Sequence, residues 1–477
     1  MLLLICIAQP ERSVDFFESM ISSTSYLSEV LVAGRAYGKK SATTDADNLR
    51  AILPLPAVLQ VFDVLLARLL TLYIDKALPP VDGTFVGARP FTQTLDISHG
   101  LQFVIEKCLD DKSQGGLAQM DVEKYYDSLD ALLVCRWLES RGVPRVICAC
   151  TLRHQLLPQV LLSVSGACIP IHHRTIGALT GSRVAGALGR IPVEATIADR
   201  ALQWRQHGFQ TDSSVLTVCI YIDNVFSVGR TLHGAISILE DFEFQLKQKW
   251  RLSIKSSSRS CLVPRGSLEL PMNESKWPLQ SSFQVLGHIL EDNGSTAMCW
   301  RNTRRSMWKA FFANSRKCLR PKFGLQLLQR AVLPCLDFRN TRWPAHSALS
   351  LNMDRVQRQM VASILRPQML SGESPEVFVR RRNRVSAAEA RRMGSWSLRH
   401  CKRVLSWRDH LLRPANSRSW AALLYQFRGF EWLLERRSQN SGGLLLGRTG
   451  TRIASGNVST RWHDGIFFAA QQLEDSS

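Results

Sequence analysis

No stretch of the sequence is apolar for long enough to span a membrane. The longest apolar stretch, residues 51–74, is interrupted by two prolines and by Asp63 and Arg68. Its leucine, valine and phenylalanine spacing predicts an amphipathic helix against a core. The apolar start, residues 1–8, has no positively charged residue before it, unlike a secretory signal. We expect this start to be a buried strand or the ragged beginning of a truncated reading frame.

Cysteines with the spacing of a metal site are also missing. Among the 12 cysteines, Cys148 and Cys150 form a close pair, but no second pair accompanies them, so a zinc site is not expected. A chain of 477 residues without a secretory signal is not expected to depend on disulfides. The sequence therefore indicates an intracellular protein with reduced thiols, in the nucleus or the cytoplasm.

Acidic residues are scarce in one block of the chain. Residues 301–440 hold 29 Lys and Arg against 8 Asp and Glu, whereas the rest of the chain holds 31 against 32. Tryptophans are interleaved with these cations, although most are expected to pack in a core. Such a block predicts a nucleic-acid partner, because cations neutralise phosphates and aromatic rings stack on bases. The alternatives are a solvated basic face and a membrane surface. The membrane surface is disfavoured because Trp and Arg are not segregated onto separate helix faces.

Two short apolar runs each lead into an aspartate. Residues 115–120 precede Asp121, and the β-rich run 215–228 is broken by Asp223 and Asn224, which predicts a hairpin. If the runs are neighbouring strands of one sheet, the two carboxylates face each other. Mg²⁺ prefers such hard oxygen ligands and shares them with substrate phosphates. Two metal ions held in this way clamp the attacking and leaving oxygens of phosphoryl transfer.

Each motif alone has an ordinary structural explanation. An Asp-Asn pair between apolar runs is a common hairpin turn, and an Asp is a common helix N-cap. The case for a metal site therefore depends on the two motifs occurring together, and on what lies between and after them.

In their order along the chain, these motifs resemble those of reverse transcriptases, in particular of non-LTR retrotransposons. The first palm motif of the family is similar to Asp121-x-x-Lys124-x-Tyr126-Asp127, and its Tyr-x-Asp-Asp hairpin is similar to residues 221–224. Residues 177–186 resemble the family's Gly-x-x-Gln-Gly-x-x-x-Ser-Pro segment, and residues 252–255 its palm-floor lysine region. Residues 285–287 resemble the strand that grips the primer, and residues 50–52 and 87–89 resemble parts of the fingers.

The resemblance implies a function for the chain: an RNA-directed DNA polymerase that uses two Mg²⁺ ions, with Mn²⁺ as a substitute. Its partners would be an RNA template, a DNA primer or target, and deoxynucleoside triphosphates. The implied catalytic residues are Asp121 and Asp223, which with Asn224 also bind the metal. The implied nucleotide contacts are Tyr126, Lys124, Arg89, Arg50 and Gly181. The implied primer and template contacts are Leu286, Gly287, Arg304 and Arg305.

Tyr126 separates the members of the polymerase class. Reverse transcriptases place an aromatic ring five residues after the metal-binding aspartate, where it excludes a 2′-hydroxyl group. Viral RNA-dependent RNA polymerases place a polar residue there. The resemblance therefore implies DNA synthesis, and the alternative is that Tyr125 and Tyr126 are packing aromatics.

Three departures from the family pattern put activity in question. The second aspartate of the hairpin is Asn224, the glutamine of the middle segment is Thr180, and its Ser-Pro is Ala185-Gly186. Asparagine keeps an oxygen ligand but loses its negative charge, which weakens metal binding. The alternative function is a catalytically inactive remnant that only binds RNA or DNA.

The resemblance implies an α+β right-hand polymerase with a basic helical C-terminal extension. The expected divisions are an unassigned segment (1–48), fingers and palm (49–300), a helical thumb (301–370) and a Trp- and Arg-rich extension with a flexible end (371–477). Residues 130–165 and 231–250 are expected to be helical, 283–290 a strand, and the chain after 300 mainly helical.

Overall fold

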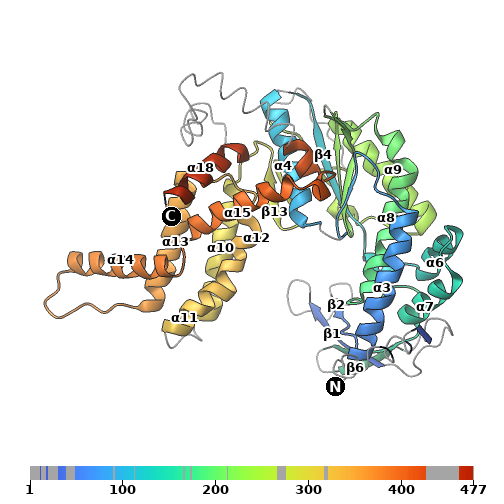
Figure 1. Cartoon of the computed structure of the whole chain (residues 1–477), viewed down its shortest axis with the longest axis horizontal. Helices are drawn as coiled ribbons and strands as arrows, with labels where there is room; N and C mark the ends of the chain where they lie inside the picture. Colours follow the sequence, from blue (N-terminus) through green and yellow to red (C-terminus); the bar gives the residue numbers. More distant parts are fainter. Residues whose placement is uncertain are drawn as a thin grey trace.

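The computed structural model is a mixed helix-and-sheet protein. It describes residues 31–38, 49–89, 92–111, 113–164, 167–171, 174–211, 213–265, 276–315, 321–425 and 461–475, together with residues 11, 15, 18 and 19. Two sheets with their helices form one half of the molecule, and a helical group from α10 to α14 forms the other (Figure 1). Within the described part, none of the helices is both long and apolar enough to cross a membrane.

A five-stranded sheet forms the centre of the first half. Its strand order is β11-β4-β10-β9-β3, and all neighbours are antiparallel except β3 and β9. The strands are β3 (Phe85–Val86), β4 (Gly116–Asp121), β9 (Val218–Tyr221), β10 (Asn224–Gly229) and β11 (Ser260–Leu262). Side chains along β9 alternate between two separate hydrophobic cores, because Val218 and Ile220 join one and Cys219 joins the other. The sheet is therefore buried on both faces.

Helices cover both faces of this sheet. One core holds α3 (Ala57–Ala77), α6 (Ala131–Ser140), α7 (Arg145–Leu156), α8 (Arg183–Trp204) and α9 (Leu232–Trp250). The other core holds α4 (Thr94–Asp111). The short helix α5 (Tyr125–Ser128) follows β4 directly. The expected strand before Asp121, the hairpin after 215 and the helix 231–250 are confirmed to within a residue or two.

A second, four-stranded sheet lies below the five-stranded sheet in Figure 1. Its order is β2-β1-β5-β6, formed by β1 (Leu31–Gly38), β2 (Leu49–Ile52), β5 (Gln159–Val164) and β6 (Ala167–Ile171). The expectation that 130–165 is helical throughout is wrong, because the helices end at Leu156 and β5 follows. The segment 1–48, which the sequence left unassigned, supplies β1, and the start at residues 1–8 lies outside the described residues.

The remaining short elements connect these layers. They are β7 (Phe209–Gln210), β8 (Val215–Leu216) and the 3-10 turn η2 (Ser256–Ser258). The single strand expected at 283–290 is wrong. The segment is a hairpin of β12 (Ser282–Val285) and β13 (His288–Glu291), because Leu286 and Gly287 both have positive φ and reverse the chain.

The described part of the second half is mainly helical, as expected. It contains α10 (Ala297–Ser315), α11 (Pro321–Leu327), the π-helical turn η3 (Leu328–Val332), α12 (Leu333–Asn340), α13 (Ser347–Leu365) and α14 (Pro375–Arg392). The chain continues through α15 (Trp396–Leu411), the 3-10 turn η4 (Pro414–Asn416) and α18 (Trp462–Glu474). Residues 426–460 of the expected Trp- and Arg-rich extension lie outside the described residues.

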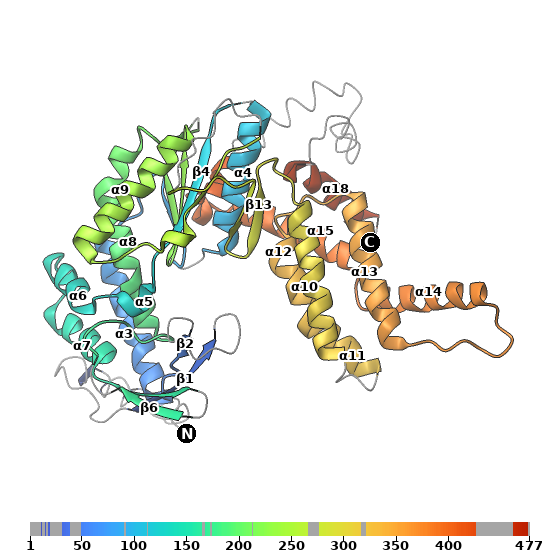
Figure 2. The same ribbon diagram turned by 180° about the vertical axis from the view of Figure 1, so that it is seen from behind.

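The last helices return to the central sheet. Trp407 on α15 and Trp462 on α18 belong to the same core as α4 and the sheet. The indole Nε1–H of Trp407 donates a 2.8 Å hydrogen bond to Nδ1 of His99 on α4, and the ring of Trp462 meets His99 edge-on at 4.8 Å. Figure 2 shows α15 and α18 between the sheet and the α10–α13 group. The C-terminal helices therefore connect the two halves.

Candidate active site

The two aspartates singled out by the sequence lie side by side at one end of the central sheet. Asp121 ends β4 and pairs with Asn224, which begins β10. Asp223 lies in the two-residue turn between β9 and β10, and its carbonyl oxygen accepts a 3.0 Å hydrogen bond from the N–H of Val122. Both aspartates line one cavity of about 770 Å³, a volume typical of small-molecule sites. The expectation that the two runs are neighbouring strands is confirmed.

Both aspartates lie next to strained backbone. Ile222, the first turn residue, has φ of 61°, and Lys124 has φ of 45°. A β-branched residue seldom adopts positive φ, and holding one there costs about 1–3 kcal/mol. Strain of this kind persists where the surrounding structure fixes it, and it collects at ligand-binding and catalytic sites. Here the strained residues are Ile222, in the turn that carries Asp223, and Lys124, three residues after Asp121.

Asn224 does not line this cavity. Its side chain turns along the hairpin, and Nδ2 donates a 2.8 Å hydrogen bond to Oδ1 of Asp223. The amide thus occupies one lone pair of a carboxylate that the sequence assigns to metal binding. For Asn224 to bind a metal ion in the cavity, its side chain would have to turn so that the amide oxygen points into the cavity.

Tyr126 forms a wall of the cavity. Its carbonyl oxygen accepts a 2.8 Å hydrogen bond from the N–H of Ala178, and α8 approaches so closely that a Cβ on Gly189 would lie 3.1 Å from Cε1 of the ring. Burial, followed by the negative charge of Asp223, raises the pKa of Tyr126 to about 12. The phenol is therefore neutral at physiological pH and presents a ring and a hydroxyl beside Asp223.

The segment between the two motifs closes the cavity from the opposite side. Thr180 donates its hydroxyl to the carbonyl of Ala51 on β2 at 3.1 Å. Gly181 has φ of 103°, and a Cβ there would meet the carbonyl oxygen of Leu53 at 3.0 Å. Thr180, Gly181 and Ala185 all line the cavity. The segment therefore joins the four-stranded sheet to the site.

Sequence reasoning missed the residue that holds this segment in place. Asp63 on α3 is buried and accepts hydrogen bonds from the Ser182 hydroxyl at 2.5 Å, the Arg183 N–H at 2.6 Å and, depending on its tautomer, His154 at 2.7 Å. Ser182 is the N-cap of α8. The available signal was a lone carboxylate inside an apolar helical run, since a buried charge needs partners.

Replacing Asp63 with Ala is expected to lower the free energy of unfolding by about 3–5 kcal/mol, because His154 and Ser182 would lose a buried partner. Burial opposes ionisation, but the hydrogen bonds from His154, Ser182 and Arg183 outweigh it and lower the pKa of Asp63. Its contribution is thus complete above about pH 4 and is lost as the pH falls through the lowered pKa. Urea unfolding at several pH values measures both effects. An equal loss in Asp82→Ala, an exposed carboxylate, would contradict the assignment.

Charged side chains of both signs surround the cavity. Lys124 and Lys255 line it, together with the carboxylates of Glu123 and Asp127 and the two aspartates. The backbone of Lys255 is fixed to the end of β4, because its N–H donates a 3.0 Å hydrogen bond to the carbonyl of Asp121. The site therefore combines oxygen ligands for a cation with ammonium groups suited to phosphate.

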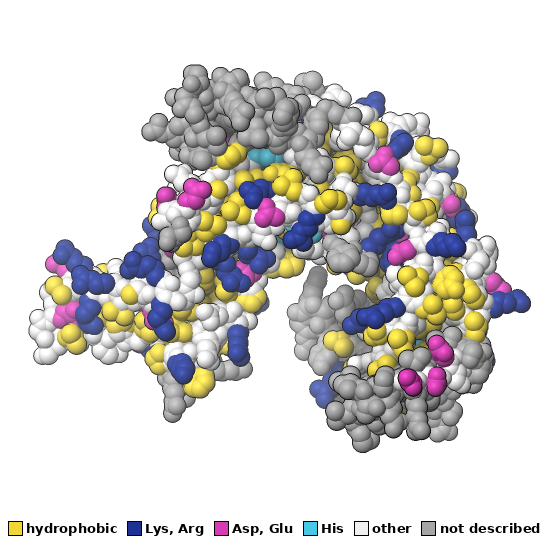
Figure 3. All heavy atoms as spheres, in the orientation of Figure 1, with side chains coloured by type: hydrophobic (Ala, Val, Ile, Leu, Met, Phe, Trp, Pro, Cys, Tyr) yellow, Lys and Arg dark blue, Asp and Glu magenta, His cyan; other side chains and the backbone are white. Residues whose placement is uncertain are grey.

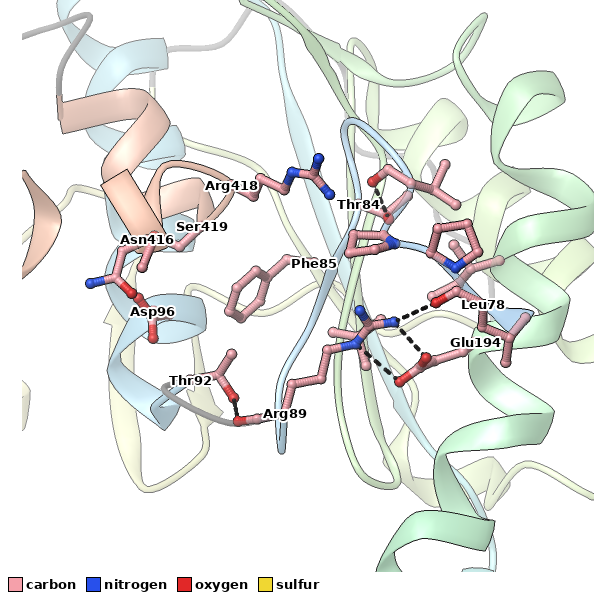
Figure 4. Close-up of a pocket in the computed structure, with 16 residues that line it drawn as sticks. Leu78, Thr84, Phe85, Arg89, Thr92, Asp96, Glu194, Asn416, Arg418 and Ser419 are labelled. Carbon is pink, nitrogen blue, oxygen red and sulfur yellow. Dashed lines mark hydrogen bonds and ion pairs between the residues drawn. The ribbon is translucent and has the colours of Figure 1, made fainter. Parts of the chain in front are cut away.

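Arg89 lies outside this cavity. It follows β3 and forms an ion pair with buried Glu194 on α8, at 2.5 Å between Nη2 and Oε2, and it also donates to the carbonyl of Leu78. Figure 4 shows these contacts at the edge of a separate cavity of about 180 Å³, with Arg418 on another side. Arg50 lies on β2, beside the Ala51 of the cavity wall, but its side chain is outside the described part of the structure.

The predicted primer and template residues also lie elsewhere. Leu286 and Gly287 form the turn of the β12–β13 hairpin, where Arg339 donates a 2.9 Å hydrogen bond to the carbonyl of Gly287. Arg304 and Arg305 are exposed on α10. None of these four lines the aspartate cavity.

The donor set of the cavity fits a hard cation that completes its shell with substrate. In the described part of the chain, no group of three or more His, Cys, Asp or Glu side chains is arranged as a metal site. Asp121 and Asp223 supply carboxylate oxygens only, which suits Mg²⁺ bound through one or two carboxylates and substrate phosphates. A closed structural zinc site, which needs four protein ligands, does not fit.

Comparisons with known proteins add little beyond this geometry. No protein-family model matches the sequence. No curated protein matches it either. Among solved structures, the chain is similar to apo telomerase from Candida tropicalis (TM-score 0.41, 9% identity, 86% of this chain and 68% of that chain). It is also similar to telomerase from Candida albicans in complex with a TWJ fragment of telomeric RNA (0.40, 11%, 85% and 70%).

A third similar structure is apo telomerase from Candida tropicalis truncated from its C-terminal domain. Its TM-score is 0.36 at 10% identity, and the match covers 56% of this chain. The chain spans 54% of the length of that structure. Likenesses this weak carry no argument about activity, so the functional case depends on the residues of the site.

Proposed function

We propose that this chain is a reverse transcriptase, which adds deoxynucleotides to a primer 3′-end on an RNA template. One observation carries the proposal. Asp121 and Asp223, far apart in the sequence, line the same cavity as Tyr126 and Lys124. This is the set of residues that the resemblance to non-LTR retrotransposon enzymes assigns to metal, sugar and phosphate.

In the proposed reaction, the primer 3′-oxygen attacks the α-phosphorus of the incoming nucleotide, and pyrophosphate leaves. Asp121 and Asp223 would hold two Mg²⁺ ions, or Mn²⁺, which when bound lower the pKa of the attacking hydroxyl and neutralise charge on the leaving group. Tyr126 would bound the space around the sugar, and Lys124 and Lys255 would attract the phosphates. Gly181 contributes backbone at the cavity wall, where a side chain would collide with Leu53.

The proposed partners follow from this reaction. They are an RNA template, a DNA primer or target, and deoxynucleoside triphosphates, met in the nucleus or the cytoplasm. We also propose that the chain comes from a retrotransposon, and the support for this origin is the order of the sequence motifs alone. The exposed basic residues of α10, including Arg304 and Arg305, would give these partners a cationic surface.

A second candidate function is nucleic-acid binding without catalysis. The observation that favours it is the hydrogen bond from Asn224 to Oδ1 of Asp223. This bond occupies an oxygen of Asp223 that would otherwise bind metal. Asn224 is itself a neutral side chain at a position where the family has a charged ligand. Thr180 and Ala185 depart from the family pattern in the same cavity.

Extension of oligo(dT) on poly(rA) with dTTP and Mg²⁺ tests the proposal directly. We expect labelled product that disappears when EDTA removes the metal and that falls when poly(dA) replaces the RNA template. A folded chain that binds the primer–template but makes no product, at any Mg²⁺ or Mn²⁺ concentration, would favour the binding-only function.

Replacing Tyr126 with Ala is expected to raise incorporation of UTP relative to dTTP by about tenfold to a hundredfold, because the ring would no longer fill the space of a 2′-hydroxyl; one steric contact is worth about 1–3 kcal/mol. The measurement is the ratio of kcat/KM for the two nucleotides on the same primer–template. Tyr126→Phe is the matched control and should keep the native ratio. An unchanged ratio in Tyr126→Ala would mean that the ring is only a packing aromatic.

A further inference from the structure

The helix α14 (Pro375–Arg392) has a surface that the polymerase proposal does not use. It contains six arginines and two glutamates, and it extends from the end of the molecule opposite to α6 and α7 (Figure 1). Several Lys and Arg side chains lie at this end in the space-filling view, among hydrophobic and a few acidic ones (Figure 3). The proposed polymerase reaction therefore gives no role to the basic surface of α14.

Only the C-terminal half of α14 packs against the body. Its buried residues are Ser386 and Ala390. Gln357 on α13 donates hydrogen bonds to the carbonyls of Ala390 and Gly394, at 3.3 and 2.9 Å. None of residues 375–385 is buried. The N-terminal half therefore stands clear of the body, and the loop before the helix runs along one side of it (Figures 1 and 2).

The arginines of this half divide into two groups. Arg381 is structural, because it forms a paired hydrogen bond with Glu373 at 2.9 and 2.7 Å and also donates to the carbonyl of Gln368. It thereby fastens the preceding loop to the helix. Arg380, Arg382 and Arg384 are exposed and form no ion pair with any residue in the described ranges.

The exposed arginines point to more than one side of the helix. Arg380 and Arg384 are four residues apart and share a face, whereas Arg382, two residues from each, lies nearly opposite. On the side of the helix away from Arg381 and the loop that it holds, exposed Val379 and Asn383 lie between the two sets of arginines. A single phosphate chain would meet only one side of such a helix. Two phosphate chains that flank the helix would meet both sides.

We propose that the free half of α14 enters the major groove of a B-form DNA duplex. That groove is about 12 Å wide and accepts an α-helix of about 10–12 Å diameter. Phosphates then lie on both sides of the helix, beside Arg380 and Arg384 on one and Arg382 on the other. Val379 and Asn383 then face the base edges, where a thymine methyl group provides an apolar contact and an asparagine amide hydrogen-bonds to adenine. An A-form RNA duplex is disfavoured, because its major groove is too narrow.

The test is binding of the full chain to a labelled 20-base-pair DNA duplex and to an RNA duplex of the same sequence, by fluorescence anisotropy between about 50 and 200 mM salt. Neither Mg²⁺ nor nucleotide is added, so the result does not depend on polymerase activity. The variant is Arg380→Gln/Arg382→Gln/Arg384→Gln. The matched control, Arg136→Gln/Arg153→Gln/Lys247→Gln, removes the same charge from exposed positions on α6, α7 and α9.

We expect the α14 variant to bind the DNA duplex about a hundredfold more weakly at 150 mM salt, and the slope of log K against log salt to fall by about 2–3, since each lost phosphate contact removes about 0.9. Binding of the RNA duplex should change less than about threefold, and the control variant should bind DNA as the native chain does. An equal loss for RNA and DNA would overturn the groove proposal, and so would a DNA loss no larger than that of the control. Unfolding midpoints must stay at the native value, as exposed substitutions allow.

Discussion

Replacing Asp121 with Ala is expected to lower the rate of primer extension at least about a thousandfold, which corresponds to about 4 kcal/mol of transition-state stabilisation. Asp121 and Asp223 are the two aspartates that meet at the sheet end, so the loss of either removes half of the charged ligand set. Asp199→Ala is the matched control, because that carboxylate pairs with Lys249 on the outer side of α8 and α9. A similar loss in the control would point to instability and not to metal binding.

Substitution at the neighbouring position should work in the opposite direction. In Asn224→Asp, a third carboxylate would replace the amide that now donates to Asp223. Without metal, like charges at one strand end repel, so the unfolding midpoint should fall. Mg²⁺ should restore it, because ligand binding to the folded state stabilises that state. Extension should rise by about tenfold or more and reach half its maximum at lower Mg²⁺.

These outcomes separate the two candidate functions. A gain in Asn224→Asp from an inactive native chain would mean an intact site with one weakened ligand. If extension, metal dependence and stability are all the same in Asn224→Asp and the native chain, Asn224 is remote from any metal, and the two-aspartate site loses its main support.

The sequence predicted the local parts of the site well. The strand before Asp121, the hairpin at Asp223 and the helix α9 follow from patterns of apolar residues within a few turns, and such patterns report local structure directly. The pairing of β4 with β10 followed from the motifs and from the assumption that both serve one reaction. The left-handed conformation of Ile222 was not predictable, because a β-branched residue gives no signal for it.

The parts that the sequence missed depend on partners far along the chain. Strand β1 pairs with β5, and five helices, α3 to α7, lie between the two strands in the described part of the sequence. Arg89 matched a motif for phosphate contact, but its side chain pairs with Glu194 on α8. No periodicity within a short window reveals such a partner. Long-range packing of this kind decides which partner a charged residue meets.

The same limitation applied to the C-terminal helices, and it leads to the second large prediction. The basic composition of residues 371–477 suggested an appended nucleic-acid-binding extension. In the structure, Trp407, Trp420 and Trp462 are buried in one core with α4 and the sheet. A Cβ on Gly100 of α4 would lie only 2.8 Å from Cβ of Trp420, so α4 is shaped to receive this segment.

Replacing Trp407 with Ala is therefore expected to lower the free energy of unfolding by about 3–5 kcal/mol. The change removes a large buried ring and leaves Nδ1 of buried His99 without its hydrogen bond donor. Since whole domains are stable by only about 5–15 kcal/mol, Trp407→Ala combined with Trp420→Ala should not fold. Leu412→Ala, at an exposed position just after α15, is the control and should cost less than about 0.5 kcal/mol.

A chain that ends at Gly394 gives the sharper form of this test. It would lack α15 and α18 and would expose the face of α4 that carries His99 and Phe103. We expect this truncated chain to aggregate or to lose its cooperative unfolding transition in urea, as exposed apolar core surface would require. A truncated chain that is monomeric and unfolds cooperatively, with native stability, would mean that residues 395–477 are an independent extension, as their composition first suggested. Because α15 and α18 connect the sheet to the α10–α13 group, we expect the basic C-terminal chain to be part of the frame that holds the two halves together.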